Sequence, residues 1–394
     1  MVSEKMFELG SKRSVIRETF EYGRKRAQEI GAEHVFDFSL GNPNVPAPDC
    51  VNEAIMDLTA NADPVFLHGY TSAPGDYNVR KAIADYLNKT HGVSLRADNL
   101  YMTAGAAASL CITLKALAVP GDEFAVFVPF FPEYRVFVEA AGGKLVVVPV
   151  NENTLQIDAE RFSMAITEKT KAVIVNSPNN PSGVVYTEES ILALCRILNE
   201  KSEKYGHPIY IITDEPYREL VYDEIRVPFI PKYYKSTVVC YSYSKSLSIP
   251  GERIGYIAVP EEAEDSHRVY AAVCGAGRAL GYVCAPNLFQ QVAARCVGKA
   301  SDISVYKKNR DLLYDGLTRF GYRCIKPDGA FYLFVKALES DANAFCERAK
   351  KFELLLVAGD DFGCPGYVRI AYCVKTQQIK NALPAFEKLA QEYK

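Results

Sequence analysis

Short β-rich runs and longer helical runs alternate along the middle of this chain, from about residue 49 to residue 283. Helical periodicity, as at 109–118, 133–141 and 188–205, separates most of the β-rich runs. This alternation predicts parallel strands joined by right-handed crossovers, in one sheet with helices on both faces. Ligands of such sheets bind at the carboxyl ends of the strands. The expected strands are 124–128, 144–150, 172–176, 209–213, 238–241 and 254–259.

The flanking segments predict a smaller α+β unit. Residues 11–31 have the spacing of an amphipathic helical arm, a short strand is expected at 35–40, and the long helical stretch 287–320 is interrupted near Gly298 and Ser301. Further strands at 331–335 and 367–373 precede a closing helix at 376–393. We therefore expect an N-terminal arm with part of the small domain at 1–48, a large domain at 49–285 and a C-terminal small domain at 286–394.

Composition narrows the class of protein. A chain of 394 residues that is 48% hydrophobic can bury a large core, and a net charge of −3 gives no support for nucleic-acid binding. The eleven cysteines include no CxxC pair and favour a reducing, cytoplasmic location. The sequence contains no run of 18 apolar residues, so it predicts no membrane span. The five histidines are too dispersed to predict a metal site. Small molecules and further copies of the chain are the expected partners.

In the segment Ser242–Tyr256, Lys245 lies between hydroxyl side chains and is followed by Arg253, whose side chain is permanently charged. A lysine amine condenses with an aldehyde, while Ser242, Ser244 and Arg253 can hold a dianionic phosphate close to it. The combination suits an aldehyde cofactor that carries a phosphate. The alternative interpretation is an ordinary polar loop before a strand.

This segment, including the arginine eight positions after the lysine, resembles the pyridoxal-phosphate lysine segment of the aspartate aminotransferase family, fold type I. Asp214–Tyr217 and Asn176–Gly183 resemble the Asp-Glu-x-Tyr and Asn-Pro-Thr-Gly motifs of the same family, with Ser182 in place of the threonine. The matches run in family order from about residue 36 to 373. The resemblance implies an α/β fold with a mainly parallel seven-stranded sheet in the large domain, and a homodimer with shared active sites.

The residues around the cofactor's reactive ring follow from this resemblance. Lys245 is expected to form the Schiff base with pyridoxal 5′-phosphate and to move the proton during catalysis. Asp214 follows a predicted strand, where its carboxylate can keep the pyridine nitrogen protonated; on its own it could equally cap a helix. Tyr217 and Asn180 are expected at the ring oxygen, and Phe131 on the face of the ring, although Phe131 could simply be core packing.

The cofactor's phosphate is expected in a cup formed by Gly105, Ala106 and Ala107, where small side chains open a helix and expose backbone N–H groups. Because Ala107 stands where the family often has a polar side chain, this cup must depend on backbone donors together with Ser242, Ser244 and Arg253. The resemblance also implies that Tyr70 reaches the phosphate of the neighbouring subunit.

Substrate contacts are implied at Gly41, Asn180 and Arg369. Arg369 lies in an apolar strand where an unpaired guanidinium would be costly, and its planar fork suits a bidentate grip on the substrate α-carboxylate. The alternative is an internal salt bridge with Asp360 or Asp361.

The function implied is transfer of the amino group of an L-amino acid to a 2-oxo acid such as 2-oxoglutarate. Aspartate or a similar polar donor is favoured because Arg278, a cation in an otherwise small and apolar segment, lies near the point where members of the resembled family that take dicarboxylates often have an arginine. The alternative is that Arg278 is a plain surface cation. A sister activity on the same fold, such as a β-lyase, decarboxylase, amino-acid oxidase or cyclase, is the alternative. A regulatory ligand-binding module is a second alternative, which would require an attached DNA-binding domain.

Overall fold

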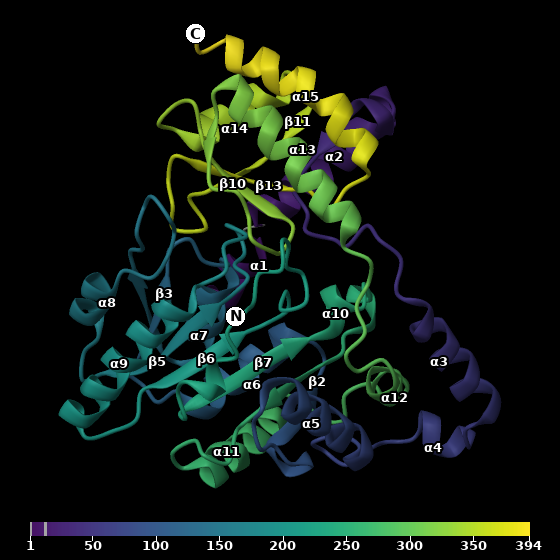
Figure 1. Cartoon of the computed structure of the whole chain (residues 1–394), viewed down its shortest axis with the longest axis vertical. Helices are drawn as coiled ribbons and strands as arrows, with labels where there is room; N and C mark the ends of the chain where they lie inside the picture. Colours follow the sequence, from purple (N-terminus) through teal and green to yellow (C-terminus); the bar gives the residue numbers. More distant parts are fainter. Residues whose placement is uncertain (1, 12–13) are drawn as a thin grey trace. The chain divides into compact units, whose positions relative to one another are not determined.

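The computed structural model describes residues 2–11 and 14–394, which form two compact units (Figure 1). The larger unit comprises 45–179 and 184–302; the smaller comprises the stretch that ends at Asn44, the short stretch 180–183 and 303–394. Assignment of residues 180–183 to the smaller unit was not indicated by the sequence pattern. Residues 12 and 13, within the helix expected at 11–31, lie outside the described residues.

In the described part of the chain, the larger unit contains a seven-stranded sheet in the order β2-β8-β7-β6-β5-β3-β4. The pairs β4/β3, β3/β5, β5/β6 and β6/β7 are parallel, as the alternation of strands and helices predicts. Its strands, several of which are labelled in Figure 1, are β2 (Leu100–Thr103), β3 (Glu123–Phe127), β4 (Lys144–Val148), β5 (Thr170–Asn176), β6 (Tyr210–Asp214), β7 (Thr237–Ser242) and β8 (Gly255–Ala258).

Strand β8 runs antiparallel to both β7 and β2. The segment between β7 and β8 contains only the single turn α10 and a 3₁₀ turn, and lacks the full helix that usually makes a parallel crossover. Reversal at β8 therefore brings its first residue, Gly255, beside the carboxyl ends of β2 and β7.

Two apolar clusters cover opposite faces of this sheet. Side chains of β7 alternate between them: Val239 and Tyr241 belong to one cluster, Val238 and Cys240 to the other. The helices of the larger unit are α3 (Asp49–Asn61), α4 (Pro64–His68), α5 (Tyr77–His91), α6 (Ala106–Leu117), α7 (Glu133–Ala141), α8 (Ala159–Ala165), α9 (Glu188–Tyr205), α10 (Tyr243–Ser246), α11 (Ser266–Ala279) and α12 (Asn287–Arg295), with 3₁₀ turns at Ala97–Asn99, Ile230–Lys232 and Pro250–Glu252. Residues of α3, α5 and α12 enter the first cluster, and residues of α6, α7 and α11 enter the second.

The smaller unit has an antiparallel sheet in the order β12-β13-β10-β9 and a short parallel pair, β1 with β11. Its strands are β1 (Phe36–Asp37), β9 (Arg323–Cys324), β10 (Tyr332–Lys336), β11 (Leu354–Leu355), β12 (Val357–Ala358) and β13 (Tyr367–Ala371). Its helices are α1 (Glu4–Ser11), α2 (Val15–Ile30), α13 (Ser304–Phe320), α14 (Ala342–Lys350) and α15 (Thr376–Gln391), with a 3₁₀ turn at Ala32–His34. The predicted break in the stretch 287–320 is confirmed, because α12 and α13 are separate helices.

Within the described ranges 2–11 and 14–394, no helix has both the length and the apolar character needed to cross a membrane.

Candidate active site

The loops after β2 and β7 meet because both strands pair with the start of β8. Thr103 and Ser242, the last residues of β2 and β7, are both register partners of Gly255. A Cβ at Gly255 would lie only 2.2 Å from the carbonyl oxygen of Tyr241 and 3.2 Å from the Cα of Gly105, so this close approach requires glycine.

Four of the residues predicted to bind phosphate lie together at this junction. The hydroxyl oxygens of Ser242 and Ser244 are 2.8 Å apart, and Arg253 Nη1 donates to Ser244 Oγ over 3.5 Å. Gly105 has a φ of +86°, and a Cβ there would lie 2.7 Å from Arg253 Nη2. The backbone of Gly105 and the guanidinium of Arg253 are therefore direct neighbours, at a position that excludes a larger side chain.

The third element of this cup is the amino terminus of α6. The helix begins at Ala106 after Gly105, and no side chain in the described ranges caps it. Its first backbone N–H groups, including those of Ala106 and Ala107, can therefore bind an anion, which the helix dipole also favours. Two hydroxyls, a guanidinium and a helix terminus together form a site suited to a phosphate group.

Asp214 ends β6 at the same edge of the sheet and is only 5% exposed. The hydroxyl of Tyr134 donates to its Oδ2 over 2.5 Å, and Asn176 Nδ2 donates to its backbone oxygen over 2.9 Å. Its other carboxyl oxygen, Oδ1, is buried with no hydrogen-bond partner in the described part of the chain. Burial raises the pKa of Asp214 to about 7.

A buried carboxyl oxygen without a partner is costly unless a ligand supplies a donor or a positive charge. The N–H of a protonated pyridine supplies both. The orphaned Oδ1 of Asp214 and the phosphate cup of the same unit therefore fit a phosphorylated pyridine aldehyde, for which Lys245 is the residue predicted to supply the amine.

Lys245 lies in the single turn α10, which Ser242 caps by accepting a hydrogen bond from the backbone N–H of Ser244. The lysine side chain is partly buried, and Tyr217 is 5% exposed. Tyr70, predicted to act on a neighbouring subunit, is 98% exposed in the single chain. The roles of these three residues stay predictions.

Tyr134 is a residue of this site that the sequence interpretation missed. It begins α7 together with Glu133, and its ring meets that of Phe131 edge-on, with centroids 5.7 Å apart. Phe131 itself is partly buried, whereas its neighbour Phe130 belongs to the core. A signal was available: Tyr134 opens a helix immediately after β3, at the carboxyl edge where ligands of such sheets bind.

In the smaller unit, Arg369 is buried among polar and aromatic groups. It is 2% exposed, and its guanidinium donates to Asn180 Oδ1 over 3.1 Å and to the backbone oxygen of Ser39 over 2.5 Å. The rings of Tyr332 and Phe362 lie against it, with centroids 4.8 and 5.0 Å away. The structure thus brings together Arg369 and Asn180, two residues predicted to bind substrate, and adds two aromatic residues that the sequence interpretation did not identify.

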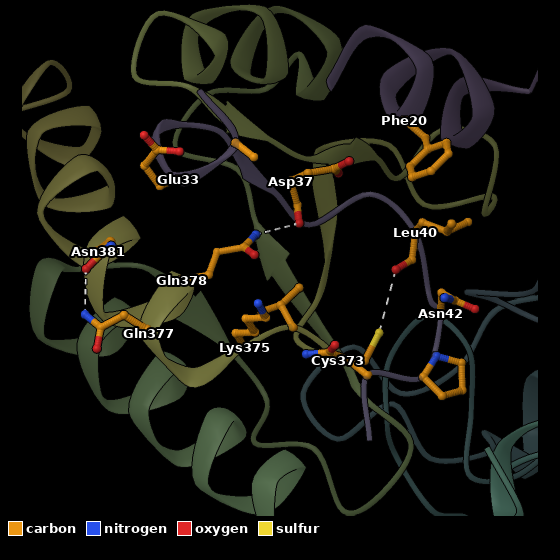
Figure 2. Close-up of a pocket in the computed structure, with 14 residues that line it drawn as sticks. Phe20, Glu33, Asp37, Leu40, Asn42, Cys373, Lys375, Gln377, Gln378 and Asn381 are labelled. Atoms are coloured by element: carbon orange, nitrogen blue, oxygen red, sulfur yellow. Dashed lines mark hydrogen bonds between the residues drawn. The ribbon is translucent and has the colours of Figure 1, made fainter. Parts of the chain in front are cut away.

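The third predicted substrate residue, Gly41, packs against one of these aromatic residues. A Cβ at Gly41 would lie 1.9 Å from the hydroxyl oxygen of Tyr332, so no larger residue fits there. The next residue, Asn42, faces a cavity of about 660 Å³ in the smaller unit. Figure 2 shows that this cavity is bordered by polar side chains of α15 that bond to each other or to backbone, as Gln378 does to the oxygen of Asp37.

Comparisons with known proteins identify the family of the chain. The profile of the family "Aminotransferase class I and II" matches residues 33–386. The aspartate aminotransferase of Thermotoga maritima is 30% identical over 98% of both chains. Among solved structures, an aminotransferase from Eubacterium rectale superimposes with a TM-score of 0.98 at 60% identity, covering 100% of this chain and 99% of the other. An aspartate aminotransferase from Thermus thermophilus with maleate gives 0.86 at 26% identity, covering 99% and 100%.

The fold and the site define a pyridoxal-phosphate-dependent transferase of fold type I. The chain belongs to the class I and II aminotransferase family, since the family profile covers most of its length.

The contact between Tyr134 and Asp214 leads to a testable prediction. We expect Tyr134→Phe to weaken both cofactor affinity and kcat about tenfold, because one hydrogen bond to a charged group contributes about 1.5 kcal/mol. Cofactor binding measured by fluorescence, and initial rates, would check this.

Tyr210→Phe is the matched control, since its buried phenol donates to the backbone oxygen of Glu264, not to Asp214. If both variants lowered thermal stability alike and left cofactor affinity unchanged, Tyr134 would have no positioning role.

Proposed function

We propose that this protein moves the amino group of an L-amino acid, with aspartate or a similar polar donor favoured, to a 2-oxo acid such as 2-oxoglutarate. The observation that carries the proposal is the pairing, in one compact unit, of the phosphate cup with a buried Asp214 that has an unsatisfied oxygen. Pyridoxal phosphate, when bound, supplies an aldehyde that condenses with amines and a ring that accepts the electron pair of a broken Cα bond.

In this proposal, Lys245 would hold the cofactor through its amine. Its Nζ, once released by the amino acid, would act as general base and general acid for the proton at the substrate Cα. The short turn α10 supports this role, because it fixes the lysine backbone directly beside the serines of the cup.

Asp214 would keep the ring nitrogen protonated, while Tyr134 holds the carboxyl group of Asp214 and Asn176 holds its backbone oxygen. Tyr217 and Asn180 are assigned to the ring oxygen, and Phe131 to the ring face. A buried charge is costly when its partner is missing. The pyridinium would supply the partner of Asp214, so this pair should contribute to tight cofactor binding.

Arg369, with Asn180 and Gly41, is assigned to the substrate α-carboxylate. Its support is the set of contacts that fix the guanidinium: two hydrogen bonds and two flanking rings leave it little freedom to reorient. A preorganised fork binds a carboxylate with less entropy loss than a mobile lysine would.

The proposed reaction class is tested by giving the cofactor-loaded enzyme one amino acid at a time without an acceptor. A transaminase should then release one equivalent of 2-oxo acid per bound cofactor and stop, resuming when 2-oxoglutarate is added. Continuous product formation without any acceptor would point to the alternative, a sister activity such as a β-lyase or decarboxylase.

The choice of donor is supported by the relatives, whose names include aspartate aminotransferase, and by the maleate, a dicarboxylate, in the Thermus structure. Arg278 is the candidate contact for a second carboxylate. It lies exposed in the last turn of α11, where a cation is free to reach a ligand or another chain.

We expect Arg278→Ala to raise the KM for aspartate about tenfold or more while leaving the KM for alanine nearly unchanged, because only aspartate has a second carboxylate. Steady-state kinetics with both donors would measure this. An equal rise for both donors, or a parent enzyme that prefers aromatic donors, would contradict the proposed specificity while leaving transamination intact.

We also propose a homodimer in which Tyr70 completes the phosphate site of its partner. The support is the nearly complete exposure of Tyr70 in the single chain, which leaves its phenol available to another copy. Mixing inactive Lys245→Ala and Tyr70→Ala chains should restore about a quarter of the parent sites at random reassortment, since one site of each hybrid dimer is then complete.

The control is a mixture of Lys245→Ala chains with Tyr70→Ala, Arg369→Ala double-mutant chains. It should restore nothing, because Arg369 is assigned to the same chain as Lys245. Hybrid dimers that form, as shown by differently tagged chains, but remain inactive in the first mixture would rule out the proposed role of Tyr70.

A further inference from the structure

A second cavity of about 450 Å³ is lined wholly by residues of the larger unit. It is enclosed by the end of α5, the segment after β6 and the strands β7 and β8. This volume is within the range of sites that bind small molecules. None of the residues assigned above to cofactor or substrate lines it.

The inner wall of this cavity is aromatic. Tyr241, Tyr243 and Tyr256 are 5%, 5% and 3% exposed, and their rings pack on each other with centroids 4.9 to 6.2 Å apart. Tyr86 of α5 completes the wall, its ring lying so close to Gly298 that a Cβ there would be 2.6 Å from it. Such a wall offers apolar ring faces to a ligand.

A carboxyl group with an unsatisfied oxygen faces this wall. The hydroxyl of Tyr241 donates to Glu219 Oε1 over 2.9 Å, but Glu219 Oε2 is buried with no hydrogen-bond partner in the described ranges. Burial raises the pKa of Glu219. A buried carboxyl oxygen of this kind calls for a donor from a bound molecule or water.

Two basic residues, Arg218 and His91, line the cavity together with Glu219. Arg218 donates to Glu215 over 2.5 Å and to the backbone oxygens of Val227 and Pro228, so its charge is largely compensated. His91 stacks on Phe229, and burial lowers its pKa to about 4, which leaves its ring uncharged near neutral pH. The charge of Arg218 still lowers the pKa of Glu219, so what Glu219 lacks is a hydrogen-bond donor for its buried Oε2.

The outer rim has the opposite charge. Arg226 and Lys299 line the cavity and are exposed. A simple amine would be repelled by this rim, and a simple anion by Glu219. A molecule with an ammonium group at one end, a carboxylate at the other and an apolar side chain would satisfy the carboxyl group, the rim and the tyrosine wall together.

We propose that this cavity is a second amino-acid site, which binds an aromatic or other apolar α-amino acid with its ammonium group on Glu219 and its carboxylate at Arg226 and Lys299. The site has a route to the catalytic lysine. Tyr241, which donates to Glu219, also lies 3.0 Å from the hydroxyl oxygen of Ser246, the residue that follows Lys245. The inference does not depend on which donor the active site uses.

The test measures binding of radiolabelled L-phenylalanine by equilibrium dialysis to the full-length holoenzyme, after borohydride reduction has fixed the cofactor to its lysine and stopped turnover. We expect one saturable site per chain that is retained in Arg369→Ala, which removes the proposed carboxylate contact of the active site. Glu219→Gln and Lys299→Glu should each weaken this binding about tenfold or more, since each removes one charge partner.

Two controls are matched in chemistry. Glu224→Gln changes an exposed acid of the same segment, and Lys115→Glu reverses an exposed cation that does not line the cavity; both should bind like the parent. If Glu219→Gln does not fold, Lys299→Glu alone decides, because its side chain is on the surface. Lack of saturable binding in the parent, or binding that Lys299→Glu leaves unchanged, would overturn the proposal.

Discussion

Lys245→Ala is expected to abolish transamination while the protein remains folded. The substitution removes the amine that holds the cofactor and moves the proton at Cα, and no other lysine has the same context of serines and an arginine. We expect a loss of about four orders of magnitude or more in kcat, and no cofactor retained covalently after borohydride reduction. Initial rates and the mass of the reduced protein would measure both effects.

The matched control is Lys235→Ala, which removes an exposed lysine of the same unit just before β7. It should keep the activity of the parent and the covalent cofactor. Activity of the Lys245→Ala chain within tenfold of the parent would refute the assignment of this lysine.

The second large effect is expected from Asp214→Asn. A neutral amide cannot hold the pyridine nitrogen in its protonated form, so the ring accepts electrons poorly. The rate should fall about a thousandfold or more, although the phosphate cup still binds the cofactor. A rate within tenfold of the parent would mean that another residue protonates the ring.

The cofactor-free chain gives an independent measurement on the same residue. The pKa of Asp214 is about 7 in the folded chain and 3.8 ordinarily. Between pH 3.8 and about pH 7, the folded chain therefore keeps a proton on Asp214 that the unfolded chain releases. Its contribution to stability is complete below about pH 4 and is lost as the pH rises through 7, by about 4 kcal/mol in total. Urea unfolding across this range should show the loss in the parent, and Asp214→Asn should remove most of it.

The architecture of the larger unit could be predicted because its signal is local. Apolar runs between helical segments show six of its seven strands directly, all but β2, and the order of strands and helices implies the parallel pairing found from β3 to β7 but not at β8. What could not be predicted is the assignment of residues 180–183 to the smaller unit, since it depends on tertiary contacts. The backbone oxygen of Gly183 accepts hydrogen bonds from Asp328 and Gly329, nearly 150 residues later in the chain.

In the candidate site, too, local features could be predicted from the sequence and tertiary contacts could not. Ser242, Ser244 and Arg253 lie in one continuous segment, so their proximity could be inferred from sequence. The contact between Tyr134 and Asp214 joins residues 80 positions apart, and the position of Tyr332 beside Arg369 depends on the antiparallel pairing of β10 with β13. Sequence patterns identify residue types at strand ends, whereas the partner of each side chain is fixed only by the packed structure.

The division of the smaller unit into separate stretches has a consequence for synthesis on the ribosome. Strand β1 pairs with β11, so Phe36 can form its strand pairing only after Leu354 has been synthesised. The larger unit ends at residue 302 and has all of its strands much earlier. A nascent chain should therefore carry α2 and β1 without their native packing while the larger unit folds. These two elements would then join the structure last, although they are made before the larger unit.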